Sequence, residues 1–217
     1  MKELAIFGST GSIGCSTLNV VRRERLRFGV SILTAGHNLE RLIGQIQEFS
    51  PRHVYIIEEK DAQTLHGLFP QLDIYWGEDG MDQVSRLTDF DIGVSALVGV
   101  AGLRPTWNMI RNGKTVALAN KEVLVTGGRL VMEAAKDCSA TLLTVDSEHS
   151  AIMQCLRGEN HAEIERILLT ASGGPFFERE ITDDITPQEA LRHPTWKMGP
   201  KITIDSATMM NKGFEII

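Results

Sequence analysis

The sequence of 217 residues has few aromatic residues and no long apolar run. Phe, Trp and Tyr make up 6% of it, and no basic stretch stands out, so a surface that stacks on nucleic-acid bases is not expected. No apolar run approaches membrane-spanning length. Leu4–Phe7 is too short and wrongly flanked for a signal peptide. We therefore expect no nucleic-acid or membrane partner and a cytoplasmic location, or the plastid stroma for a plant source.

Cysteine is also scarce, and neither sign of charge dominates. Cys15, Cys138 and Cys155 have no metal-type spacing and are odd in number, which indicates reduced, buried thiols. The formal net charge is −6, and 42% of the residues are hydrophobic. These values are typical of a globular protein with one large domain or two smaller ones.

Short β-type runs alternate with helical patterns up to about residue 145, which predicts an α/β fold with a Rossmann-like doubly wound parallel sheet. The expected strands are Leu4–Phe7, Val30–Thr34, His53–Ile57, Ile92–Ser95, Thr115–Leu118 and Thr141–Val145. The expected helices are Ser12–Arg25, Leu39–Phe49, Asp61–Leu68, Leu103–Asn112 and Glu122–Asp137.

From residue 146 the pattern changes, and we expect the start of a second, α+β domain over residues 146–217. The predicted elements are helix Ser150–Arg157, strand Ile167–Thr170 and helix Pro187–Arg192. A stretch rich in Gly, Pro, Thr and Asp separates the last two, and unstructured stretches of that length are often lids.

A glycine-rich loop follows the first strand. Gly8, Gly11 and Gly14 are spaced as GxxGxxG, and Ser9, Thr10 and Ser12 add hydroxyl groups. A tight turn at a helix start favours a dinucleotide pyrophosphate, although an ordinary strand–helix turn is the alternative. The second strand ends at Thr34 and runs into residues 35–38 without the acidic residue that NAD sites usually have, which favours NADP. Alternatively, these residues only turn the chain.

Another polar group follows the strand Thr115–Leu118. Asn120, Lys121 and Glu122 stand where parallel sheets bind ligands, so contact with cofactor or substrate is one interpretation. In the other, Asn120 caps the next helix and the two charged residues are solvated.

Asp146 and Glu148 form an acidic pair after the strand Thr141–Val145. Residues two apart in an extended chain point the same way, so both carboxylates can converge on one Mg²⁺ or Mn²⁺. The alternative is that Asp146 caps the next helix and Glu148 lies in its first turn.

The C-terminal segment is expected to be loop, strand and then a helix beginning about 205–208. Asn211 and Glu215 then share a face beside Lys212, and Ser206 lies near the helix start, where N–H groups attract phosphate. Glu215 joins the acidic pair only if it lies near it in space. The alternative is a surface helix capped by Asp205.

Three residues between these segments are candidates for ligand contact. Ser172 is followed by two glycines that let the backbone approach a ligand, and Trp196 could close over it. Alternatively, Trp196 docks the loop on the core. His193 alone is more often structural than catalytic.

In this order, the segments resemble the 1-deoxy-D-xylulose 5-phosphate reductoisomerase family of the non-mevalonate isoprenoid pathway. The matching residues are Gly8–Gly14, Leu97–Leu103, Leu118–Glu122, Val145–Ser150, Leu169–Phe176 and His193–Glu215. The resemblance implies an oxidoreductase and isomerase that uses NADPH and Mn²⁺ or Mg²⁺, with Co²⁺ as a further option. Its substrate is a phosphorylated ketose, its product is 2-C-methyl-D-erythritol 4-phosphate, and fosmidomycin is the expected mimic of the substrate.

The resemblance also implies roles for individual residues. NADPH contacts are implied for Thr10, Gly11, Ser12, Ile13, Gly36, His37, Asn38, Asn120, Glu122 and Gly199. Metal ligation is implied for Asp146, Glu148 and Glu215. Substrate contacts are implied for Lys121, Ser147, Glu148, Ser172, His193, Trp196, Ser206, Asn211, Lys212 and Glu215, of which Lys121, Glu148 and His193 are the expected catalytic residues. His37 departs from the family, which often has Lys or Arg there.

The resemblance divides the chain into an NADPH-binding domain, residues 1–145, and part of a catalytic domain, residues 146–217. Family members continue through a C-terminal helical domain and form homodimers, so a C-terminally truncated chain is expected here. Three interpretations remain: an active reductoisomerase, an inactive fragment that retains at most NADPH binding, and another NADP-linked enzyme such as a semialdehyde or homoserine dehydrogenase.

Overall fold

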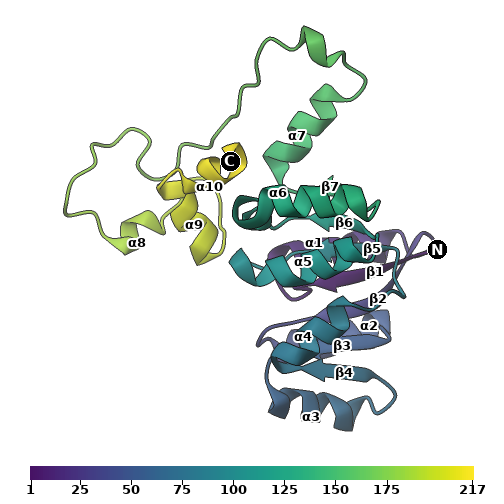
Figure 1. The fold of residues 1–217 in the computed structure, drawn as a ribbon. Helices are drawn as coiled ribbons and strands as arrows, with labels where there is room; N and C mark the ends of the chain where they lie inside the picture. Colours follow the sequence, from purple (N-terminus) through teal and green to yellow (C-terminus); the bar gives the residue numbers. More distant parts are fainter. The chain divides into compact units, whose positions relative to one another are not determined.

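The structure, a computed structural model, describes residues 1–217 and divides them into two compact units. Unit 1 is Met1–Asp146 and unit 2 is Ser147–Ile217. Figure 1 shows unit 1 in purple to green and unit 2 in green to yellow.

Unit 1 is built on a parallel sheet of seven strands in the order β4-β3-β2-β1-β5-β6-β7. The strands are β1 Lys2–Phe7, β2 Phe28–Thr34, β3 His53–Ile56, β4 Asp73–Trp76, β5 Ile92–Ser95, β6 Thr115–Leu118 and β7 Thr141–Thr144. The order reverses at β1, which is the topology of a doubly wound, Rossmann-like fold. The predicted fold class is confirmed.

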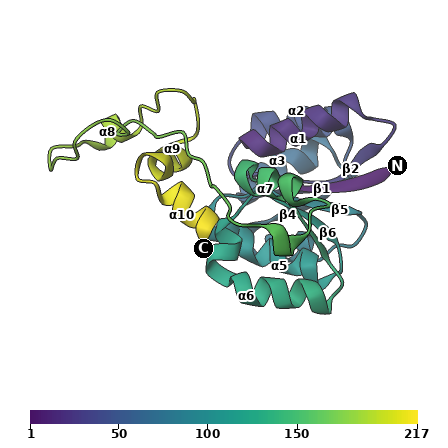
Figure 2. The ribbon, with the colours of Figure 1, turned by 90° about the horizontal axis from the view of Figure 1, so that it is seen from above.

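Helices cover both faces of this sheet. They are α1 Ser12–Arg23, α2 Leu39–Phe49, α3 Glu59–Leu68, α4 Gly77–Ser85, α5 Leu103–Arg111 and α6 Glu122–Asp137, with a 3₁₀ turn, η1, at Gly99–Gly102. Apolar side chains of α1, α2 and α3 pack in one core cluster, and those of α4, α5 and α6 pack in a second. Figure 2 shows α1 and α2 on the opposite side of the sheet from α5 and α6.

The central strand β1 shows why this sheet is covered twice. Leu4 and Ile6 belong to one core cluster, whereas Ala5 and Phe7 belong to the other. Successive strand residues point to opposite faces, so a run of four apolar residues fills both cores. In β1 the polar residues, Lys2 and Glu3, stand at the start of the strand, before this apolar run.

The sequence did not predict β4 and α4. Strand β4 is a short edge strand without a fully buried residue. Helix α4 contains Gly77 and Gly80, which weaken a helical pattern. A side chain at Gly80 would lie 3.2 Å from the Tyr75 backbone, so the glycine is needed for close packing of the helix on β4.

Unit 2 consists of short helices joined by long loops. The elements are α7 Ser147–Leu156, a 3₁₀ turn η2 at His161–Glu163, α8 Pro187–Ala190, α9 Pro200–Ala207 and α10 Met210–Ile216. The predicted strand Ile167–Thr170 is wrong, because no other strand of unit 2 is available to pair with it and Ile167 and Leu168 are exposed. The predicted order of loop, strand and helix at the C-terminal end is also wrong, because Lys201–Ile204 are helical in α9.

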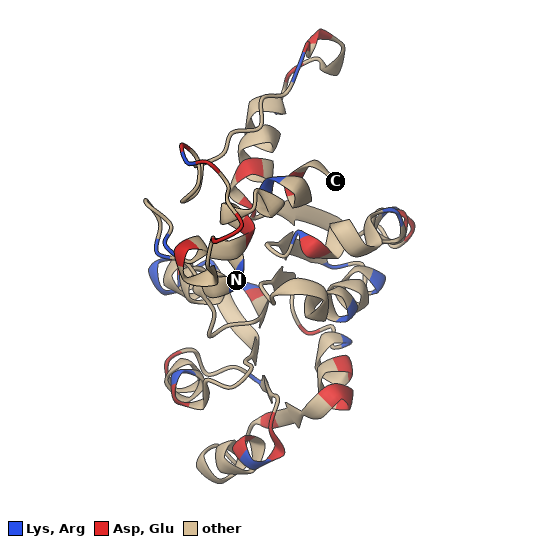
Figure 3. Ribbon diagram, turned by 90° about the vertical axis from the view of Figure 1, so that its left-hand side faces the viewer, with Lys and Arg blue, Asp and Glu red and all other residues tan.

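No helix combines the length and apolar character needed to cross a membrane. Acidic and basic residues are interspersed over both units (Figure 3). All three cysteines are free thiols as predicted, but none is fully buried and Cys155 is exposed, so the prediction of burial is wrong.

A polar network at the amino ends of β3 and β5, beside the middle of β2, centres on Asp89. Its carboxylate accepts a hydrogen bond from Ser31 Oγ at 2.9 Å and contacts His53 Nε2 at 3.1 Å and an Arg52 nitrogen at 3.5 Å. Burial raises the pKa of Asp89, but the Ser31 hydrogen bond and the charges of His53 and Arg52 lower it by more, so its pKa lies below the usual value.

This lowered pKa makes the stability of unit 1 depend on pH. A carboxyl whose pKa is lower in the folded state stabilises the fold above its unfolded pKa and loses that effect as pH falls through the folded pKa. We expect Asp89→Asn to reduce the free energy of unfolding by about 1–2 kcal/mol at pH 7 and by less below about pH 4. Denaturant titrations at both pH values test this, with the exposed Asp137→Asn as control. An equal loss at both pH values would contradict the role of the Asp89 charge.

Candidate functional site

The glycine loop turns tightly at the end of β1. Gly8 has a φ of +94°, and a side chain there would lie 2.7 Å from the carbonyl oxygen of Ala96, beside β5. A side chain at Gly14 would lie 2.3 Å from the carbonyl oxygen of Gly8. Both positions therefore require glycine, and the loop brings the start of α1 against the end of β1. Gly11, Ser12 and Ile13 remain exposed at its tip.

A buried hydrogen-bond brace, formed by Ser9, Gln45 and Thr34, holds this loop in place. Ser9 is fully buried; its hydroxyl donates to Gln45 Oε1 at 2.7 Å, and Gln45 Nε2 donates back to the Ser9 carbonyl at 2.9 Å. The Gly8 amide donates to Thr34 Oγ1 at 2.9 Å. The Ser9 hydroxyl is therefore used within the fold rather than exposed as a donor. Sequence reasoning missed Gln45, which stands in an ordinary helical pattern.

The loop after β2 lies next to this brace. Gly36 is half-buried, and His37 and Asn38 are exposed. Asn38 caps α2, because its Oδ1 accepts a hydrogen bond from the Arg41 amide at 3.0 Å. Arg41 in turn donates from its guanidinium to the Thr10 carbonyl at 2.9 Å. The ends of β1 and β2 are thereby joined through two side chains.

The end of β6 presents a buried amide. Asn120 is 3% exposed, and its Nδ2 donates to the Gly99 carbonyl of η1 at 2.7 Å. Its Oδ1 is buried and has no hydrogen-bond partner. The alternative in which Asn120 caps α6 is wrong, because Lys121 is the N-cap and has no side-chain cap bond. Glu122, the first residue of α6, is half-buried.

Lys121 is buried and paired with a carboxylate. Its ammonium lies 2.7 Å from Asp146 Oδ2, and the two side chains are only 8% and 10% exposed. The alternative of a solvated Lys121 is therefore wrong. The contact joins the polar residues that follow β6 and β7. Removal of either partner would leave the other buried without its partner, which is costly.

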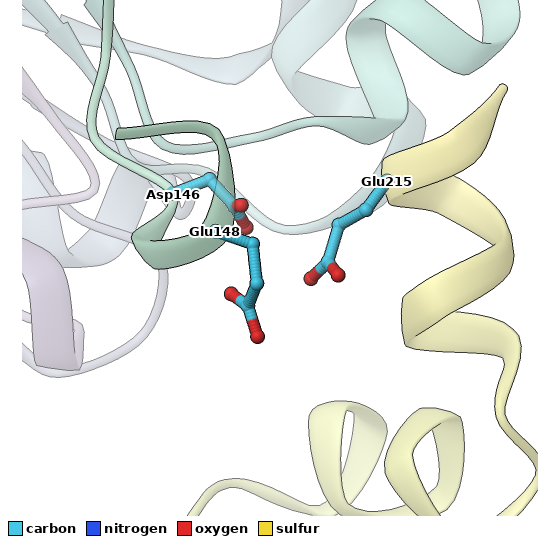
Figure 4. Close-up of side chains that lie close together, drawn as sticks. All are labelled: Asp146, Glu148 and Glu215. Carbon is cyan, nitrogen blue, oxygen red and sulfur yellow. The ribbon is translucent and has the colours of Figure 1, made fainter. Parts of the chain in front are cut away.

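In unit 2, two glutamates and a lysine form a second charged group. Glu148 in α7 and Glu215 in α10 have ligand oxygens within 4.8 Å of each other. Lys212 pairs with both: its Nζ lies 2.5 Å from Glu148 Oε1 and also contacts Glu215 Oε2. Figure 4 shows the two glutamates, together with Asp146, which precedes Ser147 in the chain. The ammonium therefore supplies the positive charge that two adjacent carboxylates require.

Neighbouring side chains orient these carboxylates. Asn211 Nδ2 donates to Glu215 Oε1 at 2.7 Å, on the shared helix face that the four-residue spacing predicted. Ser147 Oγ donates to Glu148 Oε2, and the His149 ring contacts the Glu215 carbonyl at 3.1 Å. Glu215 is only 9% exposed. Both carboxylates are held with their oxygens directed to one place.

Glu148 and Lys212 each favour the charged form of the other. Burial raises the pKa of Glu148, but the hydrogen bonds from Lys212 and Ser147 and the charge of Lys212 lower it by more, so the net shift is downward. Burial lowers the pKa of Lys212, whereas the hydrogen bonds to Glu148 and Glu215 and their charges raise it by more. Glu148 and Lys212 are both charged at neutral pH.

Ser172 and His193 also meet in unit 2, although they lie 21 positions apart in the sequence. Ser172 Oγ lies 3.1 Å from His193 Nε2. His193 Nδ1 accepts hydrogen bonds from the amides of Thr195 and Trp196 at 3.1 and 2.9 Å. These bonds leave Nδ1 without a proton, so the proton of the neutral ring is on Nε2. Trp196 is 59% exposed, so it does not dock its loop on a core.

Two other predicted residues lie at the ends of α9. Gly199 is exposed and is the N-cap of this helix. Ser206 lies in its last turn, where the helix carries partial negative charge, so its predicted place at a helix start is wrong. The Ser206 carbonyl lies 3.1 Å from where a side chain at Gly174 would begin, so the glycine after Ser172-Gly173 permits close packing on α9.

Comparison with known proteins gives the same family over almost the whole chain. The family model for 1-deoxy-D-xylulose 5-phosphate reductoisomerase matches residues 4–128, and the model for its C-terminal domain matches residues 142–217. The reductoisomerase of Thermoanaerobacter pseudethanolicus is 51% identical and that of Listeria innocua 48%, in each case over 100% of this chain. The chain spans 57 and 58% of the length of these two relatives.

Solved structures similar to this chain come from the same family. A DOX-P reductoisomerase in complex with NADPH, fosmidomycin and magnesium is 38% identical, with a TM-score of 0.91 over 100% of this chain and 57% of its own. The reductoisomerase of Zymomonas mobilis in complex with NADPH is 39% identical, with a TM-score of 0.89 over 99% of this chain and 56% of its own. The chain therefore belongs to the 1-deoxy-D-xylulose 5-phosphate reductoisomerase family.

Proposed function

We propose that this chain binds NADPH, a divalent metal and a phosphorylated ketose, and that it serves the conversion of 1-deoxy-D-xylulose 5-phosphate to 2-C-methyl-D-erythritol 4-phosphate. The observation that carries the proposal is the convergence of Glu148 and Glu215 within 4.8 Å. An enzyme that only transfers hydride has no need of such a pair. Family membership and the ligands of the solved relatives support the same reaction.

The glycine loop supports NADPH binding in unit 1. Its backbone is held close to β5 and its tip, Gly11–Ile13, is exposed, which leaves space for a pyrophosphate at the start of α1. Thr10, Gly36, His37 and Asn38 flank this tip. The orphaned Oδ1 of Asn120 is a hydrogen-bond acceptor that a cofactor amide would satisfy. Glu122 and Gly199 are proposed as further contacts.

The carboxylates support a hard divalent cation such as Mn²⁺ or Mg²⁺. Glu148 and Glu215 supply oxygen ligands, and we assign Asp146, two residues before Glu148, as the third. When bound, the metal stabilises negative charge on neighbouring oxygens of the ketose during rearrangement, and NADPH supplies hydride for the reduction. Asn211 and Ser147 keep the glutamates oriented by hydrogen bonds.

Lys121 and His193 are proposed as the proton donors of the reaction. His193 Nε2 and Ser172 Oγ lie 3.1 Å apart, and their protons can bind one substrate oxygen together. Lys121 is held as an ammonium beside Asp146 and is suited to an oxygen that becomes negative. Trp196, exposed and tied through its amide to His193, is positioned to cover the substrate.

The substrate phosphate is assigned to Lys212, Asn211 and Ser206. The positive charge of Lys212 and the amide of Asn211 are the main attractions, since Ser206 is at the end of α9 rather than at its start. Lys212 now neutralises Glu148 and Glu215. A metal that binds these glutamates would release its ammonium for the phosphate.

The reaction itself is the first prediction of this proposal. The 217-residue chain mixed with NADPH, Mn²⁺ and 1-deoxy-D-xylulose 5-phosphate should oxidise NADPH, as followed by absorbance, and EDTA should abolish the reaction. A full-length family member serves as positive control. No turnover by this chain under conditions in which the control is active would limit the proposal to ligand binding.

Removal of one glutamate tests the metal site without relying on turnover. Glu215→Gln keeps the size of the side chain and one acceptor oxygen but removes an anionic ligand, so Mn²⁺ affinity should fall about 100-fold or more. Titration calorimetry or the electron-spin signal of free Mn²⁺ measures it. Glu180→Gln, on an exposed loop of the same unit, should bind Mn²⁺ as the unchanged chain does. Equal affinities for all three proteins would exclude Glu215 as a ligand.

A substitution of Lys212 should change the affinity for Mn²⁺ in the opposite direction. Lys212→Met removes the ammonium that competes for Glu148 and Glu215, so the affinity for Mn²⁺ without substrate should rise about tenfold. The affinity of the Mn²⁺-loaded chain for inorganic phosphate should fall. Lys197→Met, on an exposed loop, is the matched control. A weaker affinity for Mn²⁺ in Lys212→Met would mean that the lysine orders the carboxylates and does not compete with the metal.

A further inference from the structure

We propose that Arg41 selects NADPH over NADH by binding the 2′-phosphate of the adenosine ribose. The inference rests on the proposed function, because it takes nucleotide binding at the glycine loop as given. It concerns a residue outside the motifs that carry the family resemblance. It also accounts for phosphate recognition in a chain that has His37 where a lysine or arginine is common.

The position of Arg41 fits this role. The residue lies in the first turn of α2, which begins shortly after the carboxyl end of β2. In doubly wound folds, the residues that follow the second strand contact the 2′ position of the adenosine ribose. Asn38 Oδ1 accepts from the Arg41 amide at 3.0 Å, so the backbone that carries the side chain is fixed.

The guanidinium of Arg41 is directed to the glycine loop. One of its terminal nitrogens donates to the Thr10 carbonyl at 2.9 Å and lies 3.9 Å from Cys15 Sγ. A guanidinium has five N–H groups in a planar fork, so this single bond leaves donors for a phosphate. The side chain is exposed and can be reached by a ligand.

No carboxylate neutralises this guanidinium. Arg22 of α1 and Arg25, just beyond the end of that helix, both pair with Glu48, whereas no ion pair joins Arg41 to any residue of the chain. Glu40 is adjacent in sequence, but successive helix residues point about 100° apart. Arg41 is therefore a permanently charged, uncompensated group beside the nucleotide loop.

Arg41 is better suited to this task than His37. Arginine is charged at every working pH and binds phosphate through two parallel hydrogen bonds. Histidine carries a positive charge only in its protonated form. The exposed His37 and the cap residue Asn38 can then add donors, while Arg41 provides the charge that distinguishes a 2′-phosphate from a 2′-hydroxyl.

The test compares NADPH and NADH binding to the 217-residue chain by titration calorimetry or nucleotide fluorescence. Arg41→Gln removes the charge but keeps an amide that can donate to Thr10. It should weaken NADPH binding about 10- to 100-fold and change NADH binding less than about threefold. Arg41→Lys should retain part of the preference, because it keeps the charge without the fork. Arg23→Gln, an exposed arginine at the far end of α1, should change neither affinity.

The outcomes separate this inference from the function on which it rests. An equal loss for both nucleotides in Arg41→Gln would show that Arg41 only braces the loop through Thr10, and would overturn the inference. An unchanged preference for NADPH would overturn it as well. Failure of the unchanged chain to bind either nucleotide would overturn the proposed cofactor site, and the inference with it.

Discussion

Burial of the parallel sheet on both faces is the constraint on which the rest of unit 1 depends. Strands such as β1 contribute apolar side chains to two cores at once, and the candidate ligand-binding residues of unit 1 follow the strands. Because all seven strands are parallel, their carboxyl ends lie at one edge. The glycine loop, Arg41, Asn120 and Lys121 all follow strands at that edge. The topology thus brings these groups to one edge of the sheet.

Buried charges are paired in both units. Lys121 pairs with Asp146 in unit 1, and Lys212 pairs with Glu148 and Glu215 in unit 2. In the proposed function, a divalent metal takes over the positive charge that Lys212 now supplies. The lysine is then available to a phosphate, so metal and substrate binding would be coupled through one side chain.

The sequence predicted the regular part of this molecule because its signals are local. Apolar runs and glycine spacing marked β1, β5, β6 and the glycine loop, and the four-residue spacing predicted that Asn211 and Glu215 share a helix face. The errors occurred where the outcome depends on distant partners. A strand-like run at Ile167–Thr170 has no neighbour with which to pair, and α4 depends on a glycine packed against Tyr75. The Gln45 brace and the Lys121–Asp146 pair join residues 25 or more positions apart, and no local pattern marks them.

The central claim is that Asp146, Glu148 and Glu215 hold one divalent metal in place of the Lys212 ammonium. The most direct measurement is anomalous diffraction from crystals of the chain grown with Mn²⁺ and NADPH. Our account predicts a single strong peak at about 2.0–2.2 Å from oxygens of all three carboxylates, with Lys212 moved away from Glu148 and Glu215. Crystals in which the peak is absent, and Lys212 still lies between the two glutamates, would contradict it.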